Sequence, residues 1–134
     1  MKTIITGVIG VDSHIVGNRI IQRAMERAGF KVVGLGALTP AEEFINAAIE
    51  TDAAAIVISS LYGQGELDCQ GFRDKCSEAG LDDIRLYIGG NLAVGTQNFA
   101  EVAERYKQMG FDKVYPPTID LKEFIEDLKK DLAE

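Results

Sequence analysis

Apolar residues along this chain form short continuous runs, which alternate with longer segments where they recur every three or four positions. The continuous runs predict strands covered on both faces, at 3–9, 31–35, 54–59, 85–88 and 113–115. The periodic segments predict amphipathic helices, at 18–28, 39–51, 67–79, 99–109 and from 120 onward. This alternation predicts an α/β fold in which helices cover both faces of one parallel sheet. We expect a single, Rossmann-like domain over 1–134, whose doubly wound five-stranded sheet has the flavodoxin-like strand order 2-1-3-4-5.

Residues typical of helix ends flank the periodic segments. Thr39 and Glu42 have the spacing of a capping box, and Pro40 suits the first helical position. Asp120 is expected to cap the last helix through its carboxylate. Glycines favour the left-handed backbone of a helix C-cap, and they follow several of the predicted helices, at Gly29, Gly80 and Gly110.

The composition narrows the function classes. The chain of 134 residues has a net charge of −7 and no basic cluster, which argues against nucleic acid and anionic membranes as partners. No apolar run approaches the roughly 20 residues of a membrane span, and the early first strand leaves no room for a signal peptide. On the predicted helix, Cys69 and Cys76 are about 10 Å apart, which is too far for a disulfide. We therefore expect free thiols and a cytoplasmic protein.

The expected strand order places the ligand site. In such a sheet the first and third strands flank the switch point, and ligands bind beyond the carboxyl ends of the strands there. The loops after the first, third and fourth strands should therefore converge. These loops are also the ones richest in glycine and small hydroxyl residues, which lets a ligand approach the backbone closely.

The loop after the first strand holds the only histidine of the chain, His14, two residues after Asp12. A carboxylate bonded to one ring nitrogen orients the other for metal ligation or for general-base catalysis. The alternative is that Asp12 caps the next helix and His14 is a surface loop residue. One histidine without nearby cysteines cannot form a closed zinc site, which needs four ligands. A metal bound by His14 would bring its other ligands with it, as the metal of a macrocycle does.

The loops after the third and fourth strands offer polar and flat surfaces. Ser59 and Ser60 supply hydroxyls but no nucleophile-and-base arrangement, and such serines are often only helix caps. Gly89 and Gly90 leave the sheet edge without side chains, so either a flat group lies there or the chain simply turns. The backbone from there to Gly95 could present amides to a phosphate.

The three loops share one order of short motifs, which reads Asp12-x-His14-x-x-Gly17, Ser59-x-Leu61 and Gly89-Gly90. This order and spacing resemble the D-x-H-x-x-G, S-x-L and G-G signature of cobalamin-binding domains. The resemblance covers essentially the whole chain. Within that family, the stretches "GVIGVDSHIVGNRII", "AAIETDAAAIVISSLYGQGELDC" and "YIGGNLAVG" are similar to those of the small subunits of glutamate mutases (methylaspartate mutases).

The resemblance implies a base-off, His-on binding mode. The dimethylbenzimidazole of the cofactor leaves the cobalt, and His14 becomes the lower axial ligand while Asp12 binds its far ring nitrogen. The detached nucleotide tail enters the sheet near Ser59. By the resemblance, the cofactor-binding residues are Val11, Asp12, Ser13, His14, Ile15, Gly17, Ser59, Ser60, Leu61, Gly89, Gly90, Asn91, Leu92, Ala93, Val94 and Gly95.

The resemblance also implies the activity, a reversible rearrangement of L-glutamate to threo-3-methylaspartate with adenosylcobalamin (an isomerase of glutamate fermentation). A radical must be shielded from water, yet no segment precedes the first strand to form a lid. We therefore expect a second chain to cover the cofactor. The resemblance implies a large TIM-barrel subunit that holds the substrate, in a heterotetramer of two small and two large subunits. No catalytic residue is then expected in this chain.

Other classes fit less well. Corrinoid carriers of methyl groups usually have an N-terminal helical cap, for which the first strand begins too early. Small subunits of CoA-ester mutases, the runner-up, tend to have Ala-His where this chain reads Gln64-Gly65-Glu66. A phosphoreceiver would need an aspartate at the end of the third strand, where Ser59 and Ser60 lie. A flavin carrier would need a Ser/Thr-rich phosphate loop after the first strand.

Overall fold

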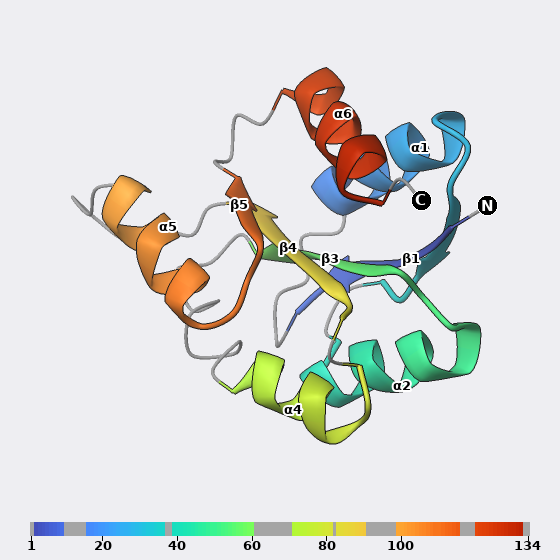
Figure 1. The fold of residues 1–134 in the computed structure, drawn as a ribbon. Coiled ribbons are helices and arrows are strands. Elements are labelled where there is room, and N and C mark those ends of the chain that lie inside the picture. The colour runs from blue at the N-terminus through green and yellow to red at the C-terminus, as the bar shows by residue number, and fades with distance from the viewer. Residues whose placement is uncertain are drawn as a thin grey trace.

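The fold is described from a computed structural model, which covers residues 2–9, 16–36, 39–60, 71–81, 83–90, 99–115 and 120–132. Its centre is a five-stranded parallel sheet of order β2-β1-β3-β4-β5 (Figure 1), as the sequence predicts. The strands are β1 Thr3–Val8, β2 Lys31–Gly34, β3 Ala55–Ser60, β4 Arg85–Gly90 and β5 Lys113–Tyr115. The described helices are α1 Val16–Arg27, α2 Ala41–Thr51, α4 Phe72–Glu78, α5 Phe99–Gln108 and α6 Leu121–Asp131.

Helices cover both faces of the sheet, which explains the continuous apolar runs of the strands. Helices α1 and α6 pack on one face, and α2, α4 and α5 pack on the other (Figure 1). The first of these layers forms what we call the α1/α6 core, made of Ile4, Met25, Ala55, Val57, Tyr87, Phe124, Leu128 and Leu132. Alternate strand residues such as Ile5, Ile56 and Leu86 belong to the opposite core.

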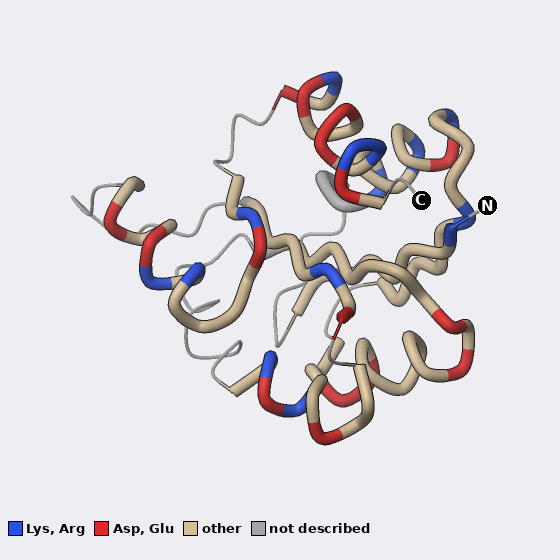
Figure 2. The backbone as a smooth tube through the Cα atoms, in the orientation of Figure 1, with Lys and Arg blue, Asp and Glu red and all other residues tan. Residues whose placement is uncertain are grey.

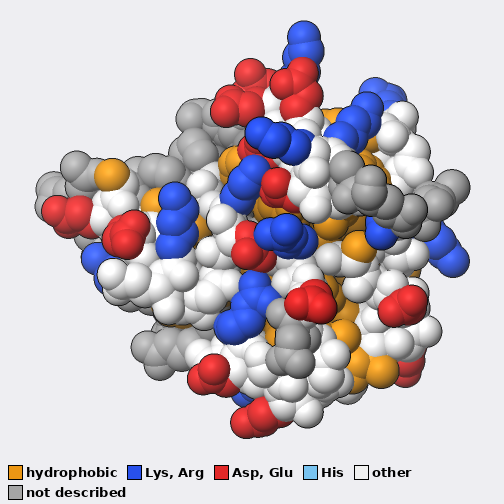
Figure 3. Space-filling model, in the orientation of Figure 1, with side chains coloured by type: hydrophobic (Ala, Val, Ile, Leu, Met, Phe, Trp, Pro, Cys, Tyr) orange, Lys and Arg blue, Asp and Glu red, His pale blue; other side chains and the backbone are white. Residues whose placement is uncertain are grey.

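The surface of the described part carries charges of both signs. Acidic and basic residues are interspersed along the outer helices (Figure 2), and they alternate on the face seen in Figure 3. None of the helices in the described ranges is long and apolar enough to cross a membrane. The side chain of Cys76 is buried and its thiol is free, as predicted, and burial raises its pKa to about 11. Cys69 lies outside the described residues.

The helix ends agree with the sequence analysis at some positions and correct it at others. Asp120 caps α6, because its Oδ1 accepts hydrogen bonds from the backbone N–H groups of the next turn. The predicted capping box at Thr39 is wrong: Pro40 is the N-cap, and the Thr39 hydroxyl donates to the carbonyl of Gly36 at 3.2 Å. The continuous helix predicted over 67–79 is also wrong, since Gly71 has a left-handed backbone (φ 73°) and α4 begins only after it.

Arg73, on α4, joins three parts of the fold. Its Nε and Nη2 donate to the carbonyl of Gly110 at 2.9 and 2.7 Å, and its Nη1 donates to the carbonyl of Ile84 at 2.8 Å. Nη2 also lies 3.0 Å from Oδ2 of Asp112, which accepts the backbone N–H of Leu86 at 2.8 Å. One guanidinium therefore fixes α4 to the start of β4 and to the turn before β5.

We expect Arg73→Ala to lower the free energy of unfolding by about 2–4 kcal/mol, because several charge-assisted hydrogen bonds are lost together. Urea unfolding followed by circular dichroism measures this change. Lys75→Ala on the same helix is the control, since it removes only the exposed ion pair with Glu42, which water screens. Equal midpoints for the two variants would contradict the role given to Arg73.

Candidate functional site

The register of the sheet aligns four residues across the carboxyl ends of the strands. Val8 pairs with Ser59, Ser59 with Gly89, and Gly89 with Tyr115. Residues in register on neighbouring strands point to the same face, and Tyr115 packs against the α1/α6 core. These four residues, which we call the edge row, therefore face the layer of α1 and α6.

The edge row differs from the rows behind it. One step back on the same face lie Val57 and Tyr87, which belong to the α1/α6 core, and Thr6, whose buried hydroxyl donates to the Val57 carbonyl at 2.8 Å. On the two central strands β3 and β4, the edge row has the hydroxyl of Ser59 and the glycine Gly89 where the row behind has the larger Val57 and Tyr87. A small, partly polar surface of this kind suits a flat group that also carries hydrogen-bonding atoms.

Gly89 is required by space rather than by backbone conformation. Its φ is not positive, so a side chain there would not strain the backbone. A Cβ built at Gly89 would lie 3.3 Å from the Cβ of Tyr115 and 3.7 Å from its carbonyl oxygen. The first of these distances is shorter than ordinary carbon–carbon contact. Any side chain at Gly89 would therefore displace Tyr115 or fill the surface in front of Ser59.

The structure brings together some of the residues predicted for the site. Ser59 and Ser60 end β3, in register with Gly89 and Gly90 at the end of β4, and Gly17 lies in the first turn of α1. Ser59 is buried, with 6% of its surface exposed. The remaining predicted residues, Val11, Asp12, Ser13, His14, Ile15, Leu61, Asn91, Leu92, Ala93, Val94 and Gly95, lie outside the described residues. Within the described ranges, no group of three or more histidine, cysteine, aspartate or glutamate side chains is placed to hold a metal ion.

Tyr115 was missed by the sequence analysis. Its ring packs edge-on against Phe124 of α6, with ring centroids 5.1 Å apart and an interplanar angle of 87°. Its hydroxyl donates to Oδ2 of Asp127 at 2.8 Å. Burial, followed by the bond to Asp127, raises the pKa of Tyr115. The short strand β5, "KVY", carries no local sign that its last residue adjoins Gly89, because that neighbour comes from β4.

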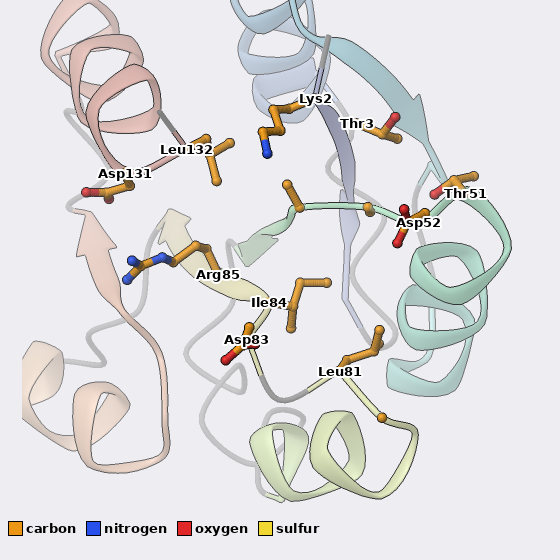
Figure 4. Close-up of a pocket in the computed structure, with 13 residues that line it drawn as sticks. Lys2, Thr3, Thr51, Asp52, Leu81, Asp83, Ile84, Arg85, Asp131 and Leu132 are labelled. Atoms are coloured by element: carbon orange, nitrogen blue, oxygen red, sulfur yellow. The ribbon is translucent and has the colours of Figure 1, made fainter. Parts of the chain in front are cut away.

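A depression of about 700 Å³ lies at the opposite edge of the sheet, where the strands begin (Figure 4). Its rim carries both cations and carboxylates, namely Lys2, Asp52, Asp83, Arg85 and Asp131. Ligands of this sheet topology bind at the carboxyl ends of the strands. We therefore assign the site to the edge row and not to this depression.

Comparison with known proteins identifies the class. A model of the B12 binding domain family matches residues 2–115. A cobalamin-binding protein from Desulfitobacterium hafniense has the same fold, with a TM-score of 0.79 and 18% identity over 98% of this chain and 59% of that one. The chain belongs to the B12 binding domain family.

Two relatives within this family are much more similar to the chain in sequence than that solved structure is. A glutamate mutase sigma subunit from Clostridium cochlearium is 58% identical, and one from Clostridium tetani is 57% identical. Each alignment covers 98% of this chain and 96% of the relative. Within the B12 binding domains, the chain belongs with the glutamate mutase sigma subunits.

Proposed function

We propose that this chain is the cobalamin-binding subunit of an adenosylcobalamin-dependent glutamate mutase, which interconverts L-glutamate and threo-3-methylaspartate. The observation that carries the proposal is the close similarity to glutamate mutase sigma subunits over nearly the whole of both chains. Adenosylcobalamin, when bound, supplies an adenosyl radical by homolysis of its cobalt–carbon bond. The role of this chain is to bind and orient that cofactor.

His14 is the residue proposed to ligate cobalt from below, in place of the cofactor's own benzimidazole. A neutral imidazole nitrogen is required for ligation. Asp12 would accept a hydrogen bond from the other ring nitrogen, which fixes the tautomer and strengthens the donor nitrogen. The connection between β1 and α1 contains both residues, and it leaves the sheet at the carboxyl end of β1, beside the edge row.

The described part of the site fits a nucleotide tail. Gly89 leaves a surface that a Cβ would fill, and the Ser59 hydroxyl can bond a ring nitrogen of a benzimidazole. Gly17 would let α1 start clear of the tail. The residues from Gly90 to Gly95 would flank the tail and its phosphate. The other predicted cofactor-binding residues are Val11, Ser13, Ile15, Ser60 and Leu61.

The substrate is proposed to bind to a separate large subunit. The name sigma subunit, carried by the relatives, supports a partner chain. Shielding a radical from water requires a cover over the cofactor. We propose a TIM-barrel partner, two copies of each subunit and a cytoplasmic location, with residues 1–134 acting as one domain.

Mixing the chain with adenosylcobalamin is expected to give a base-off spectrum, and mutase activity with L-glutamate should appear only when a large subunit is added. Absorption spectroscopy measures the first effect, and formation of 3-methylaspartate measures the second. The chain alone and the large subunit alone are the controls. An unchanged cofactor spectrum, or turnover of a CoA ester instead of glutamate, would contradict the proposal.

A further inference from the structure

Two tyrosine–aspartate pairs fix α6 to the sheet. The hydroxyl of Tyr87 donates to Oδ2 of Asp131 at 2.9 Å, and that of Tyr115 donates to Oδ2 of Asp127 at 2.8 Å. Lys113 lies between the two carboxylates, with its Nζ 3.1 Å from Asp131 and 3.7 Å from Asp127. The aspartates are one helical turn apart on α6. The two pairs therefore have the same chemistry and the same helix, but they lie at different levels of the sheet.

Only one of these pairs includes a residue of the edge row, namely Tyr115. Tyr115 is in register with Gly89, and its Cβ would lie 3.3 Å from a Cβ at that glycine. Tyr87 lies two residues before Gly89 on β4, in the α1/α6 core. Its ring packs edge-on against that of Phe124, with ring centroids 6.4 Å apart. Because the contact is with the Cβ of Tyr115, a displacement of this side chain reaches Gly89 directly, whereas a displacement of the Tyr87 side chain acts one row back.

The bond to Asp127 determines where the Tyr115 ring lies. An aromatic side chain beside a cross-strand glycine tends to fold over that glycine, because this covers exposed backbone. Here the ring instead reaches α6, where it contacts Phe124 and Asp127. Gly89 offers no side chain to hold the ring back. The hydrogen bond to Asp127 and the contact with Phe124 are thus what keep the ring on the helix side.

We propose that Asp127 is a positioning residue for cofactor binding: by accepting the Tyr115 hydroxyl, it holds the ring against α6 and keeps the backbone at Gly89 open to the nucleotide tail of cobalamin. This inference rests on the proposed function. It assigns a specific role to a carboxylate of α6 that lies outside all the predicted binding motifs. The hydroxyl of Tyr115 donates to Asp127 at 2.8 Å while its ring packs on Phe124, so both contacts hold the side chain on the α6 side.

The test compares two corrinoids, cobalamin and cobinamide, of which only cobalamin has the nucleotide tail. Tyr115→Phe and Asp127→Ala are expected to weaken cobalamin binding about three- to tenfold, the equivalent of one hydrogen bond, and to leave cobinamide binding unchanged. Asp127→Asn keeps an acceptor oxygen and is expected to bind cobalamin nearly as the wild type does. Spectroscopic titration gives the dissociation constants.

Tyr87→Phe and Asp131→Ala are the matched controls, because they remove the same kind of bond from the same helix, away from Gly89. They are expected to leave the ratio of the two dissociation constants at its wild-type value. Equal effects at both pairs, or equal weakening of both corrinoids, would reduce Asp127 to a structural role and overturn the inference. If the wild-type chain bound no cobalamin, the proposed function would be overturned too. If the wild type bound cobalamin and Tyr115→Phe bound it with the same affinity, this inference alone would be overturned. Tyr115→Phe carries the test if Asp127→Ala does not fold.

Discussion

His14→Gly is expected to lower mutase turnover in the assembled enzyme at least about 100-fold, with little change in the free energy of unfolding. Changing a residue that only orients a metal ligand already costs about 10–100-fold, so removal of the ligand itself should cost more. The fold should survive, because strands and helices of the described ranges already supply a packed core on each face of the sheet.

Two quantities are measured: turnover in the mutase assay, and electron-spin coupling between cobalt and the imidazole nitrogen. In the wild type with ¹⁵N-labelled histidine, the Co(II) state of the bound cofactor should show electron-spin coupling to one imidazole nitrogen, and His14→Gly should lose it. Asp12→Asn is the graded control, since it keeps the ligand but disturbs its tautomer, and its loss should be smaller. Wild-type turnover in His14→Gly, or a lower base that remains attached to cobalt in the wild type, would contradict the ligand role.

The fold could be predicted because helices cover both faces of the sheet, and its central strands are therefore almost wholly buried. Such strands read as continuous apolar runs, as in "AAIVIS", and they alternate with periodic helical segments. The local sequence pattern predicted a wrong N-cap at Thr39, because this residue pairs with a strand that is distant in the sequence. The backbone N–H of Thr39 donates to the carbonyl of Val8 at 3.0 Å, and Ile9 forms a bridge with Thr39. This pairing with the end of β1 holds Thr39 away from the N-cap role that its spacing predicts.

For the candidate site, the sequence predicts only which strand ends are neighbours. The order 2-1-3-4-5 implies that the ends of β1, β3 and β4 are neighbours. It does not reveal which residues share a face, because a slip of one residue exchanges the faces. Tyr115 enters the site through its register with Gly89, and Asp127 enters it through the packing of α6. Neither relation is encoded in a local motif.

Gly89→Val is expected to weaken cobalamin binding about 10–100-fold and to leave cobinamide binding much less affected. The new Cβ would lie 3.3 Å from the Cβ of Tyr115, and the two added methyl groups would fill the surface in front of Ser59. Steric crowding of this size costs about 1–3 kcal/mol in a packed core. The same crowding between the tail and the new methyl groups would appear in the binding free energy as the expected loss of affinity. Titration with each corrinoid measures the effect.

A control must show that the lower affinity of Gly89→Val comes from the filled site and not from a general loss of stability. Gly80→Ala is the control, because Gly80 has a φ of 83° in the turn after α4, where a side chain strains the backbone without approaching the edge row. It should lower the unfolding midpoint, as Gly89→Val should, and still bind both corrinoids normally. Gly89→Ala should fall between the wild type and Gly89→Val, since it adds the crowded Cβ without the branches. If Gly89→Val bound cobalamin as tightly as the wild type, the nucleotide tail would not lie over the edge row, and the inference about Asp127 would fail with it.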